Sequence, residues 1–252
     1  MFNQNLIKTL STINPITNSI VLQYPVTYGV SEDHAISFKI NVSEIDNDEF
    51  NDINLNDSLK DFISLFSLFN DFKCKEENGI FTITGEKNKA DFILSDPVLM
   101  GAFKVPDGFF SKLDNAPTVA NFDLDAETLR TLRTSFSVFR DSDCVSFNSV
   151  DNSVFLKVET NSRFAATQSN SYSLTVDSNP SKEFKIKISN SNISLLPLCD
   201  YKVEIKYSSK NDYYVVLLKT DDIPGFEVAL APLVWPTSIL KDRCFHLELQ
   251  EL

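Results

Sequence analysis

The feature that most restricts the fold of this chain is a helix-to-strand pattern that occurs once in each half of its 252 residues. In the first half, residues 68–75 end a predicted helix and open a strand, and an Asn-Gly turn leads into a second strand at 80–83. In the second half, residues 196–204 follow a short helical segment and open a strand that turns and returns at 214–217. The pattern predicts two similar domains, each composed of a helix, four strands, a helix and about four strands.

The predicted strands are short and alternate between apolar and polar residues, as half-buried strands do. They lie at 19–23, 36–42, 79–84, 90–94, 144–147, 154–158, 172–176, 184–188, 201–207, 213–219 and 227–230. Turn sequences at 77–79, 151–153 and 210–212 join successive strands, and helical crossovers between every pair are missing. We therefore expect an α+β fold with antiparallel sheets.

The predicted domains are residues 1–100 and 121–252, and residues from about 235 form an extra C-terminal segment. Between the domains, residues 101–120 contain two glycines and two prolines among apolar side chains, which predicts an extended connector. Its phenylalanines either pack against the sheets they bridge or line the edge of a groove where partner peptides dock.

One predicted helix, at 125–140, carries an apolar face and a cationic flank. At 100° per residue its leucines and phenylalanines fill one sector, and a neighbouring sector holds Arg130, Arg133, Ser137 and Arg140. This pattern also fits an ordinary solvated helix whose arginine stems pack along the buried stripe.

Two further helices show the same theme more weakly. The helix predicted at 56–70, with Asn56 as its N-cap, is apolar around most of its circumference and leaves a thin strip of Lys60, Ser64 and Ser67. The helix predicted at 3–13 has one apolar side and a polar side that includes Lys8.

These cations stand in a chain with a formal net charge of -12. A duplex-binding domain of ordinary type would be basic overall, because phosphate neutralisation supplies much of its affinity. Positive charge confined to a few helices suits a protein that surrounds DNA without gripping it.

Other functional classes find little support in the sequence. We expect a soluble intracellular protein, because no apolar run approaches 20 residues and no secretory leader is present. The four cysteines are scattered and we expect them to be reduced, and with only two histidines we expect no metal site and no cofactor.

An enzyme is one alternative, since Asp46, Asp48, Asp52 and Asp57 are spaced like a metal-binding loop. Phe50 and Asn51, however, replace the oxygen donor and glycine that such a loop needs, and catalytic motifs are missing. The second alternative is an acidic structural or virion protein built from duplicated β-rich domains.

The chain resembles the DNA polymerase sliding clamps, in particular the trimeric clamp type of T-even bacteriophages. The resemblance runs over about residues 4 to 233 and is carried by segments 6–14, 59–71, 124–129 and 172–175, with looser similarity at 200–203 and 226–230. It is a similarity of order and spacing, because clamps have no catalytic signature.

The resemblance implies a non-enzymatic head-to-tail homotrimer in the cytoplasm, of the host cell if the source is viral, closed into a ring around duplex DNA without sequence preference. The ring would tether the DNA polymerase for processive synthesis, with a clamp loader as a further partner. The residues expected to face the DNA are Lys8, Lys60, Ser64, Ser67, Arg130, Arg133, Ser137 and Arg140. A partner-peptide pocket is expected at Leu99, Met100, Phe103, Val105, Leu230, Leu233 and Val234. The edge strands near 88–96 and 163–176 are expected to pair between subunits.

Overall fold

A computed structural model describes residues 2–46, 48–161, 170–209 and 212–233. The chain divides into two compact units. The first comprises Met1–Val105 with Ile223–Phe226, and the second comprises Pro106–Asp222 with Glu227–Leu252. The division after Val105 falls inside the stretch that the sequence suggests as a connector.

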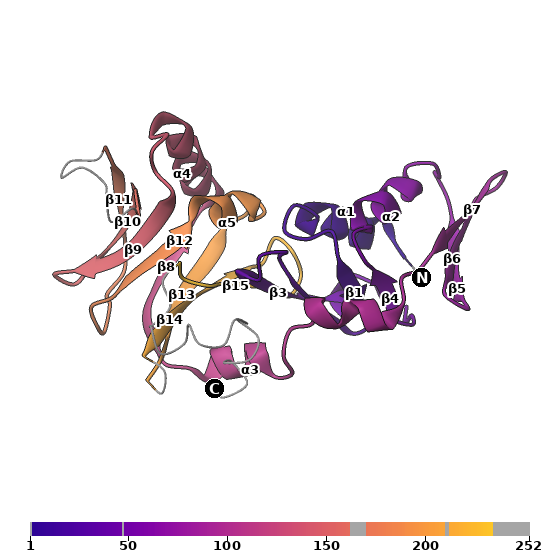
Figure 1. Ribbon diagram of the computed structural model, residues 1–252, viewed down its shortest axis with the longest axis horizontal. Coiled ribbons are helices and arrows are strands. Elements are labelled where there is room, and N and C mark those ends of the chain that lie inside the picture. The colour runs from indigo at the N-terminus through magenta and orange to yellow at the C-terminus, as the bar shows by residue number, and fades with distance from the viewer. Residues whose placement is uncertain (1, 47, 162–169, 210–211, 234–252) are drawn as a thin grey trace. The chain divides into compact units, whose positions relative to one another are not determined.

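The first unit begins with a helix, four strands, a helix and three strands (Figure 1). Its elements are α1 (Gln4–Ile13), β1 (Ile20–Leu22), β2 (Val26–Val30), β3 (Ile36–Asn41), the 3-10 helix η1 (Val42–Glu44), β4 (Ile53–Leu55), α2 (Leu59–Phe66), β5 (Lys73–Glu77), β6 (Ile80–Thr84), β7 (Lys89–Ile93) and the 3-10 helix η2 (Pro97–Phe103). The strand pairs β1–β4 and β2–β3 are antiparallel, and β5, β6 and β7 form an antiparallel meander.

The second unit repeats this order after one extra helix and one extra strand. Its elements are α3 (Phe109–Asn115), β8 (Thr118–Leu124), α4 (Ala126–Val138), β9 (Cys144–Val150), β10 (Ser153–Glu159), β11 (Tyr172–Val176), β12 (Lys185–Ser189), α5 (Asn190–Leu195), β13 (Tyr201–Ser208), β14 (Tyr213–Thr220) and β15 (Phe226–Leu230). One sheet has the order β11-β10-β9-β12, and in the other β13 lies between β8 and β14, with β15 next to β14.

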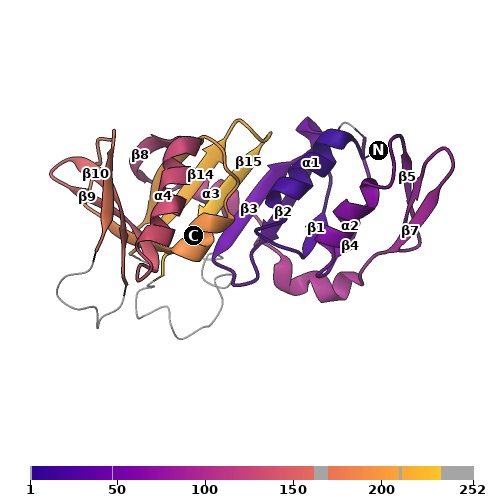
Figure 2. The ribbon, with the colours of Figure 1, turned by 90° about the horizontal axis from the view of Figure 1, so that it is seen from above.

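The predicted α+β class and the duplication are confirmed. Helices α1 and α2 pack together in one unit (Figure 2), as α4 and α5 do in the other (Figure 1). Two hairpin turns, one in each unit, have the same geometry, because Asn78-Gly79 between β5 and β6 and Asp151-Asn152 between β9 and β10 both have positive φ at the two joining residues, as a type I′ turn requires. The last strand group of each unit has three members where about four are predicted.

Three strands have no counterpart in the prediction, namely β2, β4 and β8, and β5 is predicted only as the strand that residues 68–75 open. In β2, Gly29 reads as a loop residue, but it lies against the ring of Phe38 on the paired strand, where an added Cβ would come within 2.3 Å. β4 has only three residues inside an acidic, asparagine-rich stretch, and β8 lies in the predicted connector and its C-terminal flank.

Helix α2 starts three residues later and ends four residues earlier than predicted, so Asn56 is not its N-cap and Ser67 follows the helix as its C-cap. β4 extends to Leu55, and Asp57 has a φ of 49°, which a helix cannot continue. The first amide groups of the helix are instead bound by Asn18 from the loop after α1. Its carbonyl accepts from Ser58 and Leu59, and its Oδ1 accepts from the Lys60 amide at 2.8 Å.

The connector contains the helix α3, which corrects the prediction of an extended segment. Phe109, Phe110 and Leu113 lie on one side of α3 and are at most 3% exposed. The flanking proline and glycine conceal this spacing in the sequence, and Gly108 takes a left-handed φ of 71° immediately before the helix. Of the two alternatives for the phenylalanines, packing therefore holds for Phe109 and Phe110.

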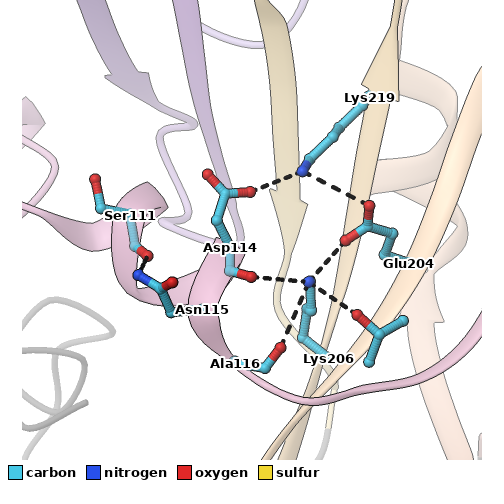
Figure 3. Close-up of polar contacts among 8 residues, drawn as sticks. Ser111, Asp114, Asn115, Ala116, Glu204, Lys206 and Lys219 are labelled. Carbon is cyan, nitrogen blue, oxygen red and sulfur yellow. Dashed lines mark hydrogen bonds and ion pairs between the residues drawn. The ribbon is translucent and has the colours of Figure 1, made fainter.

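Polar contacts fasten the end of α3 to β13 and β14 (Figure 3). The Lys206 ammonium is 5% exposed, lies 2.7 Å from the Glu204 carboxylate and donates to Thr118 Oγ1 at 2.9 Å. Its other partners are the Asp114 and Ala116 carbonyls, at 3.4 and 3.5 Å. This buried charge is therefore surrounded by acceptors, as an interior lysine must be.

Candidate nucleic-acid interface

Helix α4 presents its cations in two different ways. Asp125 caps its N-terminus by accepting from the Thr128 amide at 2.6 Å, and this bond lowers the pKa of the carboxyl. The Arg130 side chain is 56% exposed. Among the described residues its only ion pair is with Glu127, one turn earlier on the same helix. An exposed pair of this kind leaves the guanidinium available to solvent ions or phosphates.

Arg133 is directed at the neighbouring helix. Its guanidinium donates from Nε and Nη2 to the Ile193 carbonyl, at 3.2 and 3.1 Å, and from Nη2 to the Leu196 carbonyl. These carbonyls lie at the C-terminal end of α5, where a helix has acceptors without intrahelical partners. Burial lowers the pKa of Arg133 from its usual value.

A second contact holds the same turn. The buried Tyr201 hydroxyl donates to the Pro197 carbonyl at 2.8 Å, and burial raises the pKa of the phenol. Arg133 and Tyr201 together fix the path from α5 into β13. This is a structural role for Arg133 that a helical wheel of α4 alone does not reveal.

Ser137 and Arg140 are both exposed, but only Ser137 is helical. Helix α4 ends at Val138, and Phe139 has left the helical region with a ψ of 70°. Arg140 therefore belongs to the following turn, and the predicted helix is two residues too long at this end. Ser137 Oγ donates to the Thr134 carbonyl at 2.7 Å.

On the first unit, Lys8 and Lys60 are exposed on α1 and α2, which pack against each other. The hydroxyls between them turn back to their own helix. Ser64 Oγ donates to the Lys60 carbonyl and Ser67 Oγ to the Ser64 carbonyl, each at 2.7 Å. The exposed strip of α2 is thus small, polar and weakly basic, as its sequence suggests.

The four paired helices differ in charge from the rest of the chain. They hold Lys8, Lys60, Arg130 and Arg133 against the carboxylates of Asp61 and Glu127, which is a net charge of +2 where the whole chain has -12. Helix α5 has no charged residue and exposes Ser191 and Ser194. The helical segment of α5 is predicted from the sequence, but these two serines are not among the predicted DNA-facing residues. Their three-residue spacing nevertheless matches that of Ser64 and Ser67.

The predicted peptide-pocket residues divide between the units. Leu99, Met100, Phe103 and Val105 belong to the first unit, and Leu230 and Leu233 to the second, while Val234 lies outside the described residues. Met100 and Leu230 are fully buried, whereas Leu99 is 57% and Leu233 40% exposed. Because they are buried, Met100 and Leu230 cannot contact a partner peptide and can only support a surface that the exposed residues form.

The strands predicted to join subunits are edge strands. β7 ends the β5-β6-β7 sheet and β11 ends the four-stranded sheet. On β7, Ile93 is 80% exposed and pairs across to Ile80, which is 42% exposed. The part of the partner segment at 163–169 lies outside the described residues.

Within the described ranges, no helix is long and apolar enough to span a membrane. Over the same ranges, no group of histidine, cysteine or acidic side chains could hold a metal ion.

Comparison with known proteins rests on structure alone. No protein-family model and no curated protein sequence matches the chain. The crystal structure of Proliferating Cellular Nuclear Antigen from Entamoeba histolytica matches with a TM-score of 0.60 and 13% identity, over 91% of this chain and 95% of that chain.

Two structures of the H. pylori beta clamp, in complex with 5-chloroisatin and with diflunisal, match with a TM-score of 0.63. Their identities are 13% and 14%, and the match covers 91% of this chain and 64% of each of theirs. With its duplicated order of elements and its paired helices, this chain has the sliding-clamp fold.

Proposed function

We propose that the chain is a non-enzymatic sliding clamp that forms a homotrimeric ring around duplex DNA and tethers a replicative DNA polymerase. The observation that carries the proposal is the charge contrast on the duplicated fold. The paired helices of both units are net cationic in a strongly acidic chain. The similarity to clamp structures supports the fold on which this proposal builds.

The residues assigned to the DNA-facing surface are the exposed ones: Lys8, Lys60, Arg130 and Arg140, with the serines 64, 67 and 137. Flexible cations contact phosphates without reading bases, so they hold no fixed register on the duplex. Few contacts per chain also give weak, salt-sensitive binding, which sliding requires. Arg133 supports this surface by positioning α5 against α4.

The trimer follows from the two similar units in each chain and the six similar domains that the resemblance implies for the ring. We assign the subunit contact to β7 of one copy and β11 of the next. Among the described residues both are edge strands, and Ile93 of β7 forms an exposed apolar pair with Ile80 of β6. A heterologous contact of this kind closes only if its rotation matches the number of copies.

Polymerase and clamp loader are proposed to dock through short apolar peptides. The accessible members of the expected pocket are Leu99 and Leu233, and Val98, at 84% exposure, extends the apolar surface beside Leu99. The likeness to the T-even phage type rests on the sequence segments quoted above and belongs to this proposal as well.

Two measurements test the function. Light scattering should give three times the 28.4 kDa chain mass, at raised protein concentration if the ring is weak. Primer extension by the cognate polymerase should give longer products when the chain and the clamp loader are present, and less so for Arg130→Glu.

An acidic structural protein, the competing interpretation, would leave product length unchanged at every concentration. A chain that stays monomeric and does not lengthen products is not a clamp.

A further inference from the structure

An outward sheet face of the second unit gathers lysines in an otherwise acidic chain. Lys157 on β10 and Lys185 and Lys187 on β12 converge on one carboxylate, Glu159. The three ammonium nitrogens lie 3.1, 3.9 and 3.4 Å from its oxygens, in that order. One carboxylate balances one lysine, so this cluster carries a net charge of +2.

The strand register fixes which side of the sheet bears the cluster. In the strand register, Lys157 on β10 and Lys187 on β12 both lie opposite Ser146 on the central strand β9. Lys157, Ser146 and Lys187 therefore lie in one row on the same face of the sheet. Ser146 is fully buried although this face is open, because the two lysine stems flank it. The alternate residues of these strands, such as Leu156 and Ile186, point to the core instead.

The groove beside this cluster combines charged and apolar lining residues. It has a volume of about 580 Å³ and is lined by Asn148, Ser149, Val150, Phe155, Lys157, Ser173, Glu183, Phe184 and Lys185. Val150 is 51% exposed and gives the groove an apolar rim. Two lysines of the cluster, Lys157 and Lys185, also line the groove. Its size falls in the range of ligand sites, roughly 300–1,000 Å³.

We propose that this groove docks an acidic segment of a partner protein that carries an aromatic or aliphatic side chain among its carboxylates. The carboxylates would pair with Lys157 and Lys185, and the apolar side chain would contact Val150 and Phe155. The lysines attract carboxylates and the exposed Val150 suits an apolar side chain, so an acidic peptide that carries such a side chain matches both features of the groove. The site lies on a sheet face, and of its lining residues only Ser173 is on β11, the strand assigned to the subunit contact.

The probe for the test is a fluorescently labelled random copolymer of glutamate and tyrosine, bound to the full chain and followed by anisotropy. The test variant is Lys157→Gln with Lys185→Gln, and Lys185→Gln alone is the milder version if the pair weakens folding. The matched control is Lys75→Gln with Lys202→Gln, which removes the same charge from exposed lysines outside the groove. Circular dichroism checks that each variant is folded.

The groove pair should raise the copolymer dissociation constant about 2-fold to 30-fold, the range for losing two exposed ion pairs. The control pair should change it less than about twofold, and polyglutamate should bind more weakly than the copolymer. Equal effects of both pairs would mean nonspecific attraction and overturn the proposal, as would absence of copolymer binding.

Two other outcomes would assign the groove to another occupant. If a labelled dT20 oligonucleotide binds more tightly than the copolymer and loses affinity in the groove pair, the face is a nucleic-acid site. If the groove pair instead lowers the mass of the assembled chain, a second copy occupies it.

Discussion

Arg130 and Arg133 are neighbours on one helix, yet the structure gives them opposite consequences when they are changed. Arg130 is more than half exposed and pairs with Glu127 along the helix surface. Exposed pairs of this spacing stabilise a helix by about 0.2–0.5 kcal/mol. We therefore expect Arg130→Gln to leave stability within about 0.5 kcal/mol of the wild type while lowering processivity.

Arg133→Gln should be more costly. The change removes charged donors from two carbonyls at the end of α5, Ile193 and Leu196, in a half-buried setting. Hydrogen bonds to charged groups contribute about 1.5–3 kcal/mol, and some of that loss is recovered where water can reach the carbonyls. We expect a loss of about 1.5–3 kcal/mol, or roughly 3–12 °C in Tm at about 2–4 °C per kcal/mol for units of this size.

Thermal and urea unfolding followed by circular dichroism measure both variants. Arg133→Lys is the informative control, because lysine keeps the charge but cannot bind two carbonyls with a planar fork. It should recover only part of the stability that Arg133→Gln loses. If Arg133→Gln is no less stable than Arg130→Gln, the assignment of Arg133 as a positioning residue is wrong.

Three further results are expected. Lys206→Met should destabilise the second unit by about 2–4 kcal/mol in urea unfolding, because the buried acceptors that surround the ammonium lose their donor. Lys219→Met, at a more exposed site, should cost less. The reverse order would refute the account of how α3 docks. Burial alone would raise the pKa of Glu159, but the bond and charge of Lys157, with Lys185 and Lys187, outweigh it and lower that pKa. Its stabilising contribution is therefore present above the unfolded pKa and lost as pH falls through the folded one, so the stability gap between wild type and Glu159→Gln should shrink from pH 6 to pH 3; a gap constant with pH would contradict this. Ile93→Lys should give a folded monomer by light scattering, and an unchanged trimer would exclude β7 from the subunit contact.

The sequence contains most of the periodic structure. Apolar spacing locates α1, α4 and the hairpins to within a few residues, because those elements bury one face and expose the other. Turn chemistry is equally local, as the positive φ values at Asn78-Gly79 show. Each of these depends only on neighbours in the chain.

What the sequence conceals depends on residues far apart. The start of α2 is set by Asn18, some forty positions earlier, and Gly29 is a strand residue only because Phe38 lies across from it. Arg133 looks like its neighbour Arg130 until α5 is placed beside it. Individual site assignments therefore need tertiary contacts that a helical wheel does not contain.

The back-bonded serines of α2 and α4 have a kinetic consequence if these helices face DNA. Ser64, Ser67 and Ser137 already donate their protons to backbone carbonyls one turn away. A phosphate passing them meets hydroxyls with no donor to offer unless a bond inside the helix breaks first. The free-energy profile along the duplex then has shallow wells, and one-dimensional diffusion is slowed mainly by the few long cationic side chains.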